Sequence, residues 1–230
     1  MDQLLRSIII VAASIGVGVI AGNGAVYGFN RIPATWLCDY GKEPDEAVLS
    51  PHSQRIKSYP WKYVFVASFI VIDIYLGMKN WQYAIGATFA LWLLLELAIA
   101  TKKYKVISQE LVLFLAITAF GFIPFHSQYL QLLWGALIGF GGMILLGLAE
   151  KLIRKKEGLL LGSAKLCGAL GLMLGPKGIG FVLIFGVFLA GIGAAMGLLK
   201  KKQKKIVQYP LALYIEAAAG ICIVLFFPLK

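Results

Sequence analysis

Three acidic residues stand inside long apolar stretches of this sequence: Asp73, Glu96 and Glu216. An ionisable side chain is costly in hydrocarbon, so acids in such places are candidates for proton transfer, ion binding or catalysis. Glu96 precedes Thr101 by about one helical turn and could reach the same cleft. The alternative interpretation of each acid is a carboxyl group that is hydrogen-bonded between helices. We take the three acids as secondary candidates for a functional site.

Hydroxyl side chains offer a second kind of chemistry. Ser163 or Thr101 could act as a nucleophile if a lysine such as Lys165 served as its base. Residues two positions apart on a helix point in different directions, which disfavours a pair of Ser163 and Lys165. The cysteines at 38, 167 and 222 are isolated, and no His stands at zinc-ligand spacing. The sequence therefore predicts no metal site, no disulfide and no cofactor.

The elements that carry these residues are membrane spans. The chain is 60% hydrophobic and 14% charged, with a mean hydropathy of +0.81, which excludes an ordinary soluble domain. Apolar runs of roughly 17 to 25 residues predict transmembrane helices. We expect an all-α integral membrane protein, a single domain over 1–230 with about eight spans: Ser7–Phe29, Trp61–Met78, Trp81–Ala100, Leu111–Phe125, Tyr129–Ala149, Gly158–Gly175, Gly178–Leu199 and Tyr209–Pro228.

Basic residues predict the orientation of these spans. Sixteen of the 22 Lys and Arg residues fall in the first, third, fifth and seventh loops. The positive-inside rule places these loops in the cytoplasm and both termini outside. Residues 30–60 then form a cytoplasmic loop that is too short for a core of its own. The net charge of +11 is explained by anionic lipid beside the spans, so we expect a lipid bilayer and no nucleic acid as partner.

Glycines recur at intervals of three or four residues in two of the spans. One set is Gly135, Gly139, Gly141 and Gly142, and the other is Gly186, Gly191, Gly193 and Gly197. Small residues at this spacing let helices approach closely in lipid. We expect these glycines to lie at helix–helix contacts.

The segment Glu157–Leu166 has the sequence EGLLLGSAKL and is followed by a run rich in Gly, Ala and Leu. It resembles the E-G-x-x-x-G-D-x-K-L segment of the type IV prepilin peptidases, which are membrane aspartic peptidases of the GxGD type. Gly158, Gly162 and Lys165 match the family's positions. Ser163 stands where the family has a catalytic aspartate.

The segment Ala98–Gln109 is similar to the family's other motif, in which an aspartate at the end of a helix is followed by Ile-Pro-Asn. Thr101 replaces the aspartate and Ser108 replaces the proline, while Ile107 keeps its place. The order and spacing of the two motifs, together with eight spans, extend the resemblance over nearly the whole chain.

The resemblance implies a protein of the cytoplasmic (inner) membrane of a prokaryote. Members of the family cut the basic leader from type IV pilin-like or pseudopilin precursors at the cytoplasmic face. That reaction requires two carboxyl groups, of which one activates water and the other donates a proton. Hydroxyl groups are neutral near pH 7 and cannot replace the general base. We therefore expect no aspartic endopeptidase activity, with binding of the leader peptide as the function that is retained.

Two accounts of the missing aspartates stay open. The chain is either a natural non-catalytic homologue that acts in binding or assembly, or a peptidase inactivated by substitution. A function of another class also stays open, namely a small membrane transporter or channel that uses Asp73, Glu96 and Glu216. That function predicts a polar path connecting the acids.

Overall fold

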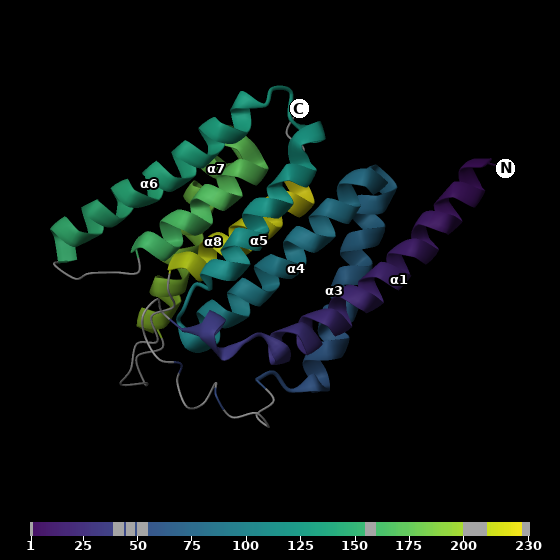
Figure 1. Cartoon of the computed structure of the whole chain (residues 1–230), viewed down its shortest axis with the longest axis horizontal. Coiled ribbons are helices and arrows are strands. Elements are labelled where there is room, and N and C mark those ends of the chain that lie inside the picture. The colour runs from purple at the N-terminus through teal and green to yellow at the C-terminus, as the bar shows by residue number, and fades with distance from the viewer. Residues whose placement is uncertain are drawn as a thin grey trace. The chain divides into compact units, whose positions relative to one another are not determined.

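The structure is a computed structural model, which describes residues 2–38, 44, 49, 55–154, 160–199 and 211–226. Seven α-helices follow one another in this part of the chain, and it contains no strand (Figure 1). Five helices are long and apolar enough to cross a membrane, and two shorter apolar helices accompany them. The expectation of an all-helical membrane protein is confirmed.

The chain divides into two compact units, Met1–Glu96 and Leu97–Lys230. The boundary falls inside helix α4 (Trp81–Tyr104). Each unit is described by itself below. The single domain over 1–230 stays a prediction.

In the first unit, α1 (Asp2–Arg31) packs against α3 (Ser58–Lys79). Two glycines of α1 make the approach close: a Cβ added at Gly22 would lie 2.4 Å from the backbone nitrogen of Val66, and one at Gly18 would lie 2.6 Å from that of Ile70. Because the later glycine meets the earlier residue of α3, the two helices are antiparallel. Small side chains permit this separation in lipid.

The expected loop over residues 30–60 is shorter than predicted at both ends. Helix α1 continues to Arg31, α3 begins at Ser58, and a short 3₁₀ helix, η1 (Ala34–Leu37), lies between them. The side chain of Asn30 donates to the carbonyl of Ile56 (3.1 Å) and accepts from its backbone N–H (2.8 Å). The guanidinium of Arg55 donates to the carbonyl oxygens of Phe29 and Ile32. These bonds tie the two ends of the loop together.

A tight turn joins α3 to α4. Oδ1 of Asn80 accepts from the backbone N–H groups of Gln82 (3.0 Å) and Tyr83 (3.2 Å). Such a side chain satisfies donors at a helix start that have no partner within the helix. Asn80 therefore sets the beginning of α4, the helix that carries Thr88, Glu96 and Thr101.

The second unit contains α5 (Gln109–Thr118), α6 (Leu130–Arg154), α7 (Leu160–Leu199) and α8 (Leu211–Ile221). The expected span Leu111–Phe125 is α-helical only to Thr118 and then becomes the 3₁₀ segment η2 (Ala119–Phe125). Pro124 lies in this segment and has no N–H to continue an α-helical ladder. A π-helical segment, η3 (Cys222–Phe226), follows α8.

Helix α7 reverses its direction at Gly175, whose backbone is non-helical with φ 69° and ψ −176°. The contacts of α6 demonstrate the reversal. A Cβ at Gly139 would lie 2.1 Å from the carbonyl of Cys167 and 3.0 Å from Ile179, residues that a straight helix would hold about 18 Å apart. Both limbs of α7 therefore lie along α6. Only glycine adopts this backbone conformation readily.

The expected count of eight spans is not confirmed. The predicted span Gly178–Leu199 and the described part of the predicted span Gly158–Gly175 both fall within the single element α7 (Leu160–Leu199), so the described residues form seven α-helices. The physical reason is that the turn at Gly175 is tight and the helix resumes directly at Pro176.

The prediction of glycine-mediated packing is confirmed at several positions. A Cβ at Gly135 would lie 2.2 Å from the carbonyl of Gly171, and Gly186 and Gly193 meet Ile215 and Tyr214 of α8. Gly141 has open space around it and makes no such contact. Glycine packing thus joins both limbs of α7 to their neighbours.

Candidate functional site

The two segments that carry the family resemblance touch each other in the second unit. A Cβ at Gly162 would lie 3.4 Å from the side chain of Ile107. Nζ of Lys165 donates to Oε1 of Gln109 at 3.0 Å. Residues more than fifty positions apart in sequence are thereby brought together, at the end of α4, the start of α5 and the first limb of α7. Gly158 lies outside the described residues.

Thr101 is fully buried in the last turn of α4. Its hydroxyl donates to Oε1 of Glu216 on α8 at 2.9 Å, and its carbonyl accepts from the backbone N–H of Lys105. Lys105 has a left-handed backbone with φ 58°, which ends the helix. Thr101 is therefore next to a carboxyl group from another helix.

Glu216 is the acid of this site. Its side chain is 2% exposed, and Oε2 has no hydrogen-bond partner among the described residues. The group also lies within electrostatic reach of the buried Cys167 on α7. A buried carboxyl oxygen without a hydrogen-bond donor is costly. Oε2 of Glu216 can therefore accept a further hydrogen bond.

Ser163 is buried on the first limb of α7, with 4% of its surface exposed. Lys165, two residues later, is exposed and donates to Gln109. The two side chains therefore face different surroundings, as the helical spacing predicts. This arrangement gives no support to a serine nucleophile with Lys165 as its base.

Ser108 has a structural role that the sequence did not reveal. Its hydroxyl accepts from the backbone N–H of Leu111 at 3.4 Å, which caps α5, and lies 3.2 Å from Oε2 of Glu110. Serine favours such helix starts. The pattern Ser-x-Glu before an apolar run was the available signal. Ile107 and Ser108 are both buried and position the start of α5 against Gly162.

Glu96 belongs to the first unit and is 1% exposed. A Cβ at Gly28 of α1 would lie 2.8 Å from its Oε1 and 3.1 Å from the ring of Trp92. This oxygen has no hydrogen-bond partner among the described residues. The expected hydrogen bond to a neighbouring helix is therefore not found at Oε1, and the acid that contacts Thr101 is Glu216, not Glu96.

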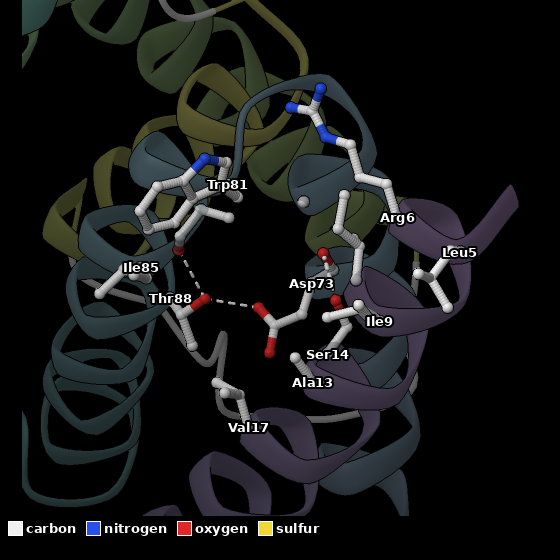
Figure 2. Close-up of a pocket in the computed structure, with 13 residues that line it drawn as sticks. Leu5, Arg6, Ile9, Ala13, Ser14, Val17, Asp73, Trp81, Ile85 and Thr88 are labelled. Atoms are coloured by element: carbon white, nitrogen blue, oxygen red, sulfur yellow. Dashed lines mark hydrogen bonds between the residues drawn. The ribbon is translucent and has the colours of Figure 1, made fainter. Parts of the chain in front are cut away.

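Asp73 also lies in the first unit and is 3% exposed. Its Oδ1 accepts from the hydroxyl of Thr88 on α4 at 2.5 Å, and its backbone carbonyl accepts from the hydroxyl of Ser14 on α1 at 3.1 Å. Figure 2 shows this hydrogen bond between Thr88 and Asp73, both of which line a cavity. Hydrogen bonds thus link Asp73 of α3 to α1 and α4. Asp73 belongs to the first unit, whereas Thr101 and Ser163 belong to the second.

No group of three or more His, Cys, Asp or Glu side chains in the described ranges could hold a metal ion. The described chain has its three cysteines free. The transporter or channel, with Asp73, Glu96 and Glu216 as its acids, stays a prediction.

Comparisons with protein-family models, with curated proteins and with solved structures gave no match. The fold identifies the chain as a helical membrane protein. Its second unit buries Thr101 at the end of α4, Ser163 on the first limb of α7 and Glu216 on α8.

Proposed function

We propose that the chain is a prepilin-peptidase-like membrane protein that binds the leader of type IV pilin-like or pseudopilin precursors without cutting it. The contact between the two resembling segments carries the proposal. Ile107 meets Gly162 and Gln109 accepts from Lys165, so Thr101 and Ser163 belong to motifs that pack together. An aspartic peptidase needs its two carboxyl groups close enough to share one proton, so packing of the two segments against each other is a requirement of the proposed relationship.

The chemistry of the residues supports binding over cleavage. A water molecule is activated by an ionised carboxylate while a second, protonated carboxyl group donates to the carbonyl oxygen. Thr101 donates to the carboxyl group of Glu216. The sequence has a threonine and a serine at the two positions where this chemistry needs carboxyl groups. The hydroxyl groups and Oε2 of Glu216 can still hydrogen-bond an extended peptide.

The proposal includes eight crossings of a prokaryotic cytoplasmic membrane, with α7 crossing twice and both termini outside. The reversal at Gly175 and the contact of both limbs with α6 support two crossings. Lys102, Lys103 and Lys105 follow Thr101 directly, and such basic residues favour the cytoplasmic side. The end of α4 that carries Thr101 would then face the cytoplasm.

A reconstitution experiment tests the proposal. The full chain in liposomes is mixed with a pilin-type precursor, and both leader cleavage and co-sedimentation of the precursor are measured. We expect binding without cleavage. Restoring the dyad by Thr101→Asp with Ser163→Asp should restore cleavage only when Glu216 is also changed, by Glu216→Gln, because an acid at position 101 would otherwise lie against a second carboxyl group.

The controls separate binding of the precursor from cleavage of its leader. Thr118→Asp places an acid outside the site. Its binding and cleavage of the precursor should equal those of the unmodified chain. Cleavage by the unmodified chain would contradict the missing-dyad argument. Absence of precursor binding, together with no rescue by the triple variant, would contradict the proposed function altogether.

A further inference from the structure

A cavity of about 530 Å³ lies inside the first unit, between α1, α3 and α4. Figure 2 shows residues of all three helices around it. Ligand sites in proteins are of this size and combine mostly apolar walls with a few fixed polar groups. The cavity has both features, because Ile9, Val17 and Ile85 line it together with Asp73.

The carboxyl group of Asp73 is fixed in the cavity but only half satisfied. Thr88 holds Oδ1 through its hydroxyl group, and Ser14 holds the backbone carbonyl of the same residue. Oδ2 is buried and has no hydrogen-bond partner among the described residues. A carboxyl group that is 97% buried in apolar surroundings requires a partner for its second oxygen.

The guanidinium group of Arg6 does not supply that partner. Arg6 also lines the cavity, but it precedes Ser14 by eight residues, which is about 12 Å along α1. Ser14 is level with Asp73, since the two are hydrogen-bonded. Figure 2 shows the guanidinium of Arg6 turned away from the carboxyl group. A cationic partner for Asp73 would therefore have to come from a bound molecule.

The walls of the cavity indicate where such a molecule comes from. Ile9 is 59% exposed and Ile85 is 65% exposed on the outside of the first unit. Both residues lie within the first eight residues of their apolar helices. In a membrane protein, exposed aliphatic side chains of an apolar span contact lipid. The cavity is thus open sideways to the acyl chains, and an occupant can enter it from the bilayer.

We propose that this cavity binds a single-chain amphiphile with a protonated amine head group. The ammonium group donates to Oδ2 of Asp73, while Thr88 keeps Oδ1 in place. The hydrocarbon chain lies along the apolar wall formed by Ile9, Val17 and Ile85. This site goes beyond the proposed leader binding and does not depend on it, because its residues belong to the first unit and Thr101, Ser163 and Glu216 belong to the second.

Photolabelling tests the site. The full chain in lipid nanodiscs is irradiated with a dodecylamine that carries a diazirine in its chain, and adducts are mapped by mass spectrometry. We expect adducts on Ile9, Val17 and Ile85. Unlabelled dodecylamine should suppress them, and dodecanol, with the same chain but no charge, should not.

Two variants and one control make the result specific. Asp73→Asn should lower labelling by at least roughly tenfold, because one partner of a desolvated charge pair is lost. Ala13→Leu fills the cavity from an exposed position and should also lower labelling without touching the acid. Glu216→Gln removes a buried acid in the second unit and should leave labelling unchanged.

Each contrary outcome overturns the site. Equal labelling of Asp73→Asn and the unmodified chain would exclude the acid as the anchor. Competition by dodecanol as strong as by dodecylamine would reduce the cavity to a lipid-filled groove, and stronger competition by dodecanoate would favour an anion at Arg6. If Asp73→Asn fails to fold, unchanged labelling of Ala13→Leu decides against the proposal.

Discussion

At the scale of single residues, the hydrogen bond from Thr101 to Glu216 is the contact that defines the candidate site. Both side chains are buried, and the bond satisfies one of the two oxygens of the carboxyl group. A threonine in place of an acid removes like-charge repulsion at this point, since two carboxyl groups within hydrogen-bond distance cannot both ionise at low cost. Thr101 and Glu216 are therefore compatible with each other in a way that an aspartate and Glu216 are not.

Thr101→Val should lower the free energy of unfolding by about 1 to 2 kcal/mol, because it leaves both oxygens of Glu216 without a donor from this helix. The measurement is an unfolding titration in detergent followed by circular dichroism. Thr118→Val is the matched control, since its hydroxyl is exposed and bonds only to the carbonyl of Phe114 in its own helix. Its effect should stay within about 0.5 kcal/mol.

The double variant Thr101→Val with Glu216→Met sharpens this test. Replacing both partners by apolar groups of similar shape removes the unsatisfied carboxyl group, so the double variant should be more stable than Thr101→Val alone. Equal losses for Thr101→Val and Thr118→Val would show that the buried bond contributes nothing.

At the scale of elements, glycines determine how closely α6 lies to α7. Gly135 and Gly139 of α6 face backbone carbonyl groups of α7 at distances that leave no room for a Cβ. Backbone atoms cannot move aside as the end of a side chain can, so a larger residue would force the helices apart. The same contacts hold the first limb of α7, and with it Ser163, in position.

Gly139→Ala should lower the free energy of unfolding by about 2 kcal/mol, in the range of overpacked cores. Its added Cβ would lie 2.1 Å from the carbonyl oxygen of Cys167. Gly141→Ala, two residues along the same helix, has nothing within 4 Å and should be neutral or stabilising by up to about 1 kcal/mol. Unfolding in detergent compares the pair, and equal effects would show that α6 and α7 do not pack in this way.

At the scale of the whole molecule, the number of membrane crossings depends on α7. If each of the other six helices crosses once and α7 also crosses once, the two termini lie on opposite sides. If it crosses out and back at Gly175, the termini lie on the same side. The contacts of both limbs with α6 favour the second arrangement, which the distribution of basic residues predicts independently.

Reporter fusions at the two ends measure this directly. We expect alkaline phosphatase to be active at both the N-terminus and the C-terminus, with a fluorescent protein dark at both. A fusion after Lys103 should give the reverse result. Activity at one end only would establish an odd number of crossings and would contradict eight spans.

The sequence by itself determined the class of the molecule and most of its helices. Apolar runs of sufficient length have one favourable conformation in hydrocarbon, because every backbone group must be paired inside the chain. It also determined which acids were unusual, since Asp73, Glu96 and Glu216 stand out against their apolar neighbours. The sequence also placed the end of one predicted span at Gly175, where the helix breaks. The local cause is a glycine followed by proline, which interrupts a helix.

Only the tertiary structure decided which of these residues meet. Glu96 is close to Thr101 in sequence, yet Thr101 donates to Glu216, which is 115 positions away. Asp73 lines a cavity, and Ser108 caps the start of α5. The spacing of residues in the sequence does not predict the contacts that form the cavity. Helical periodicity fixes the face on which a side chain stands, whereas the neighbour of that face is set by how helices pack, and packing depends on the whole chain.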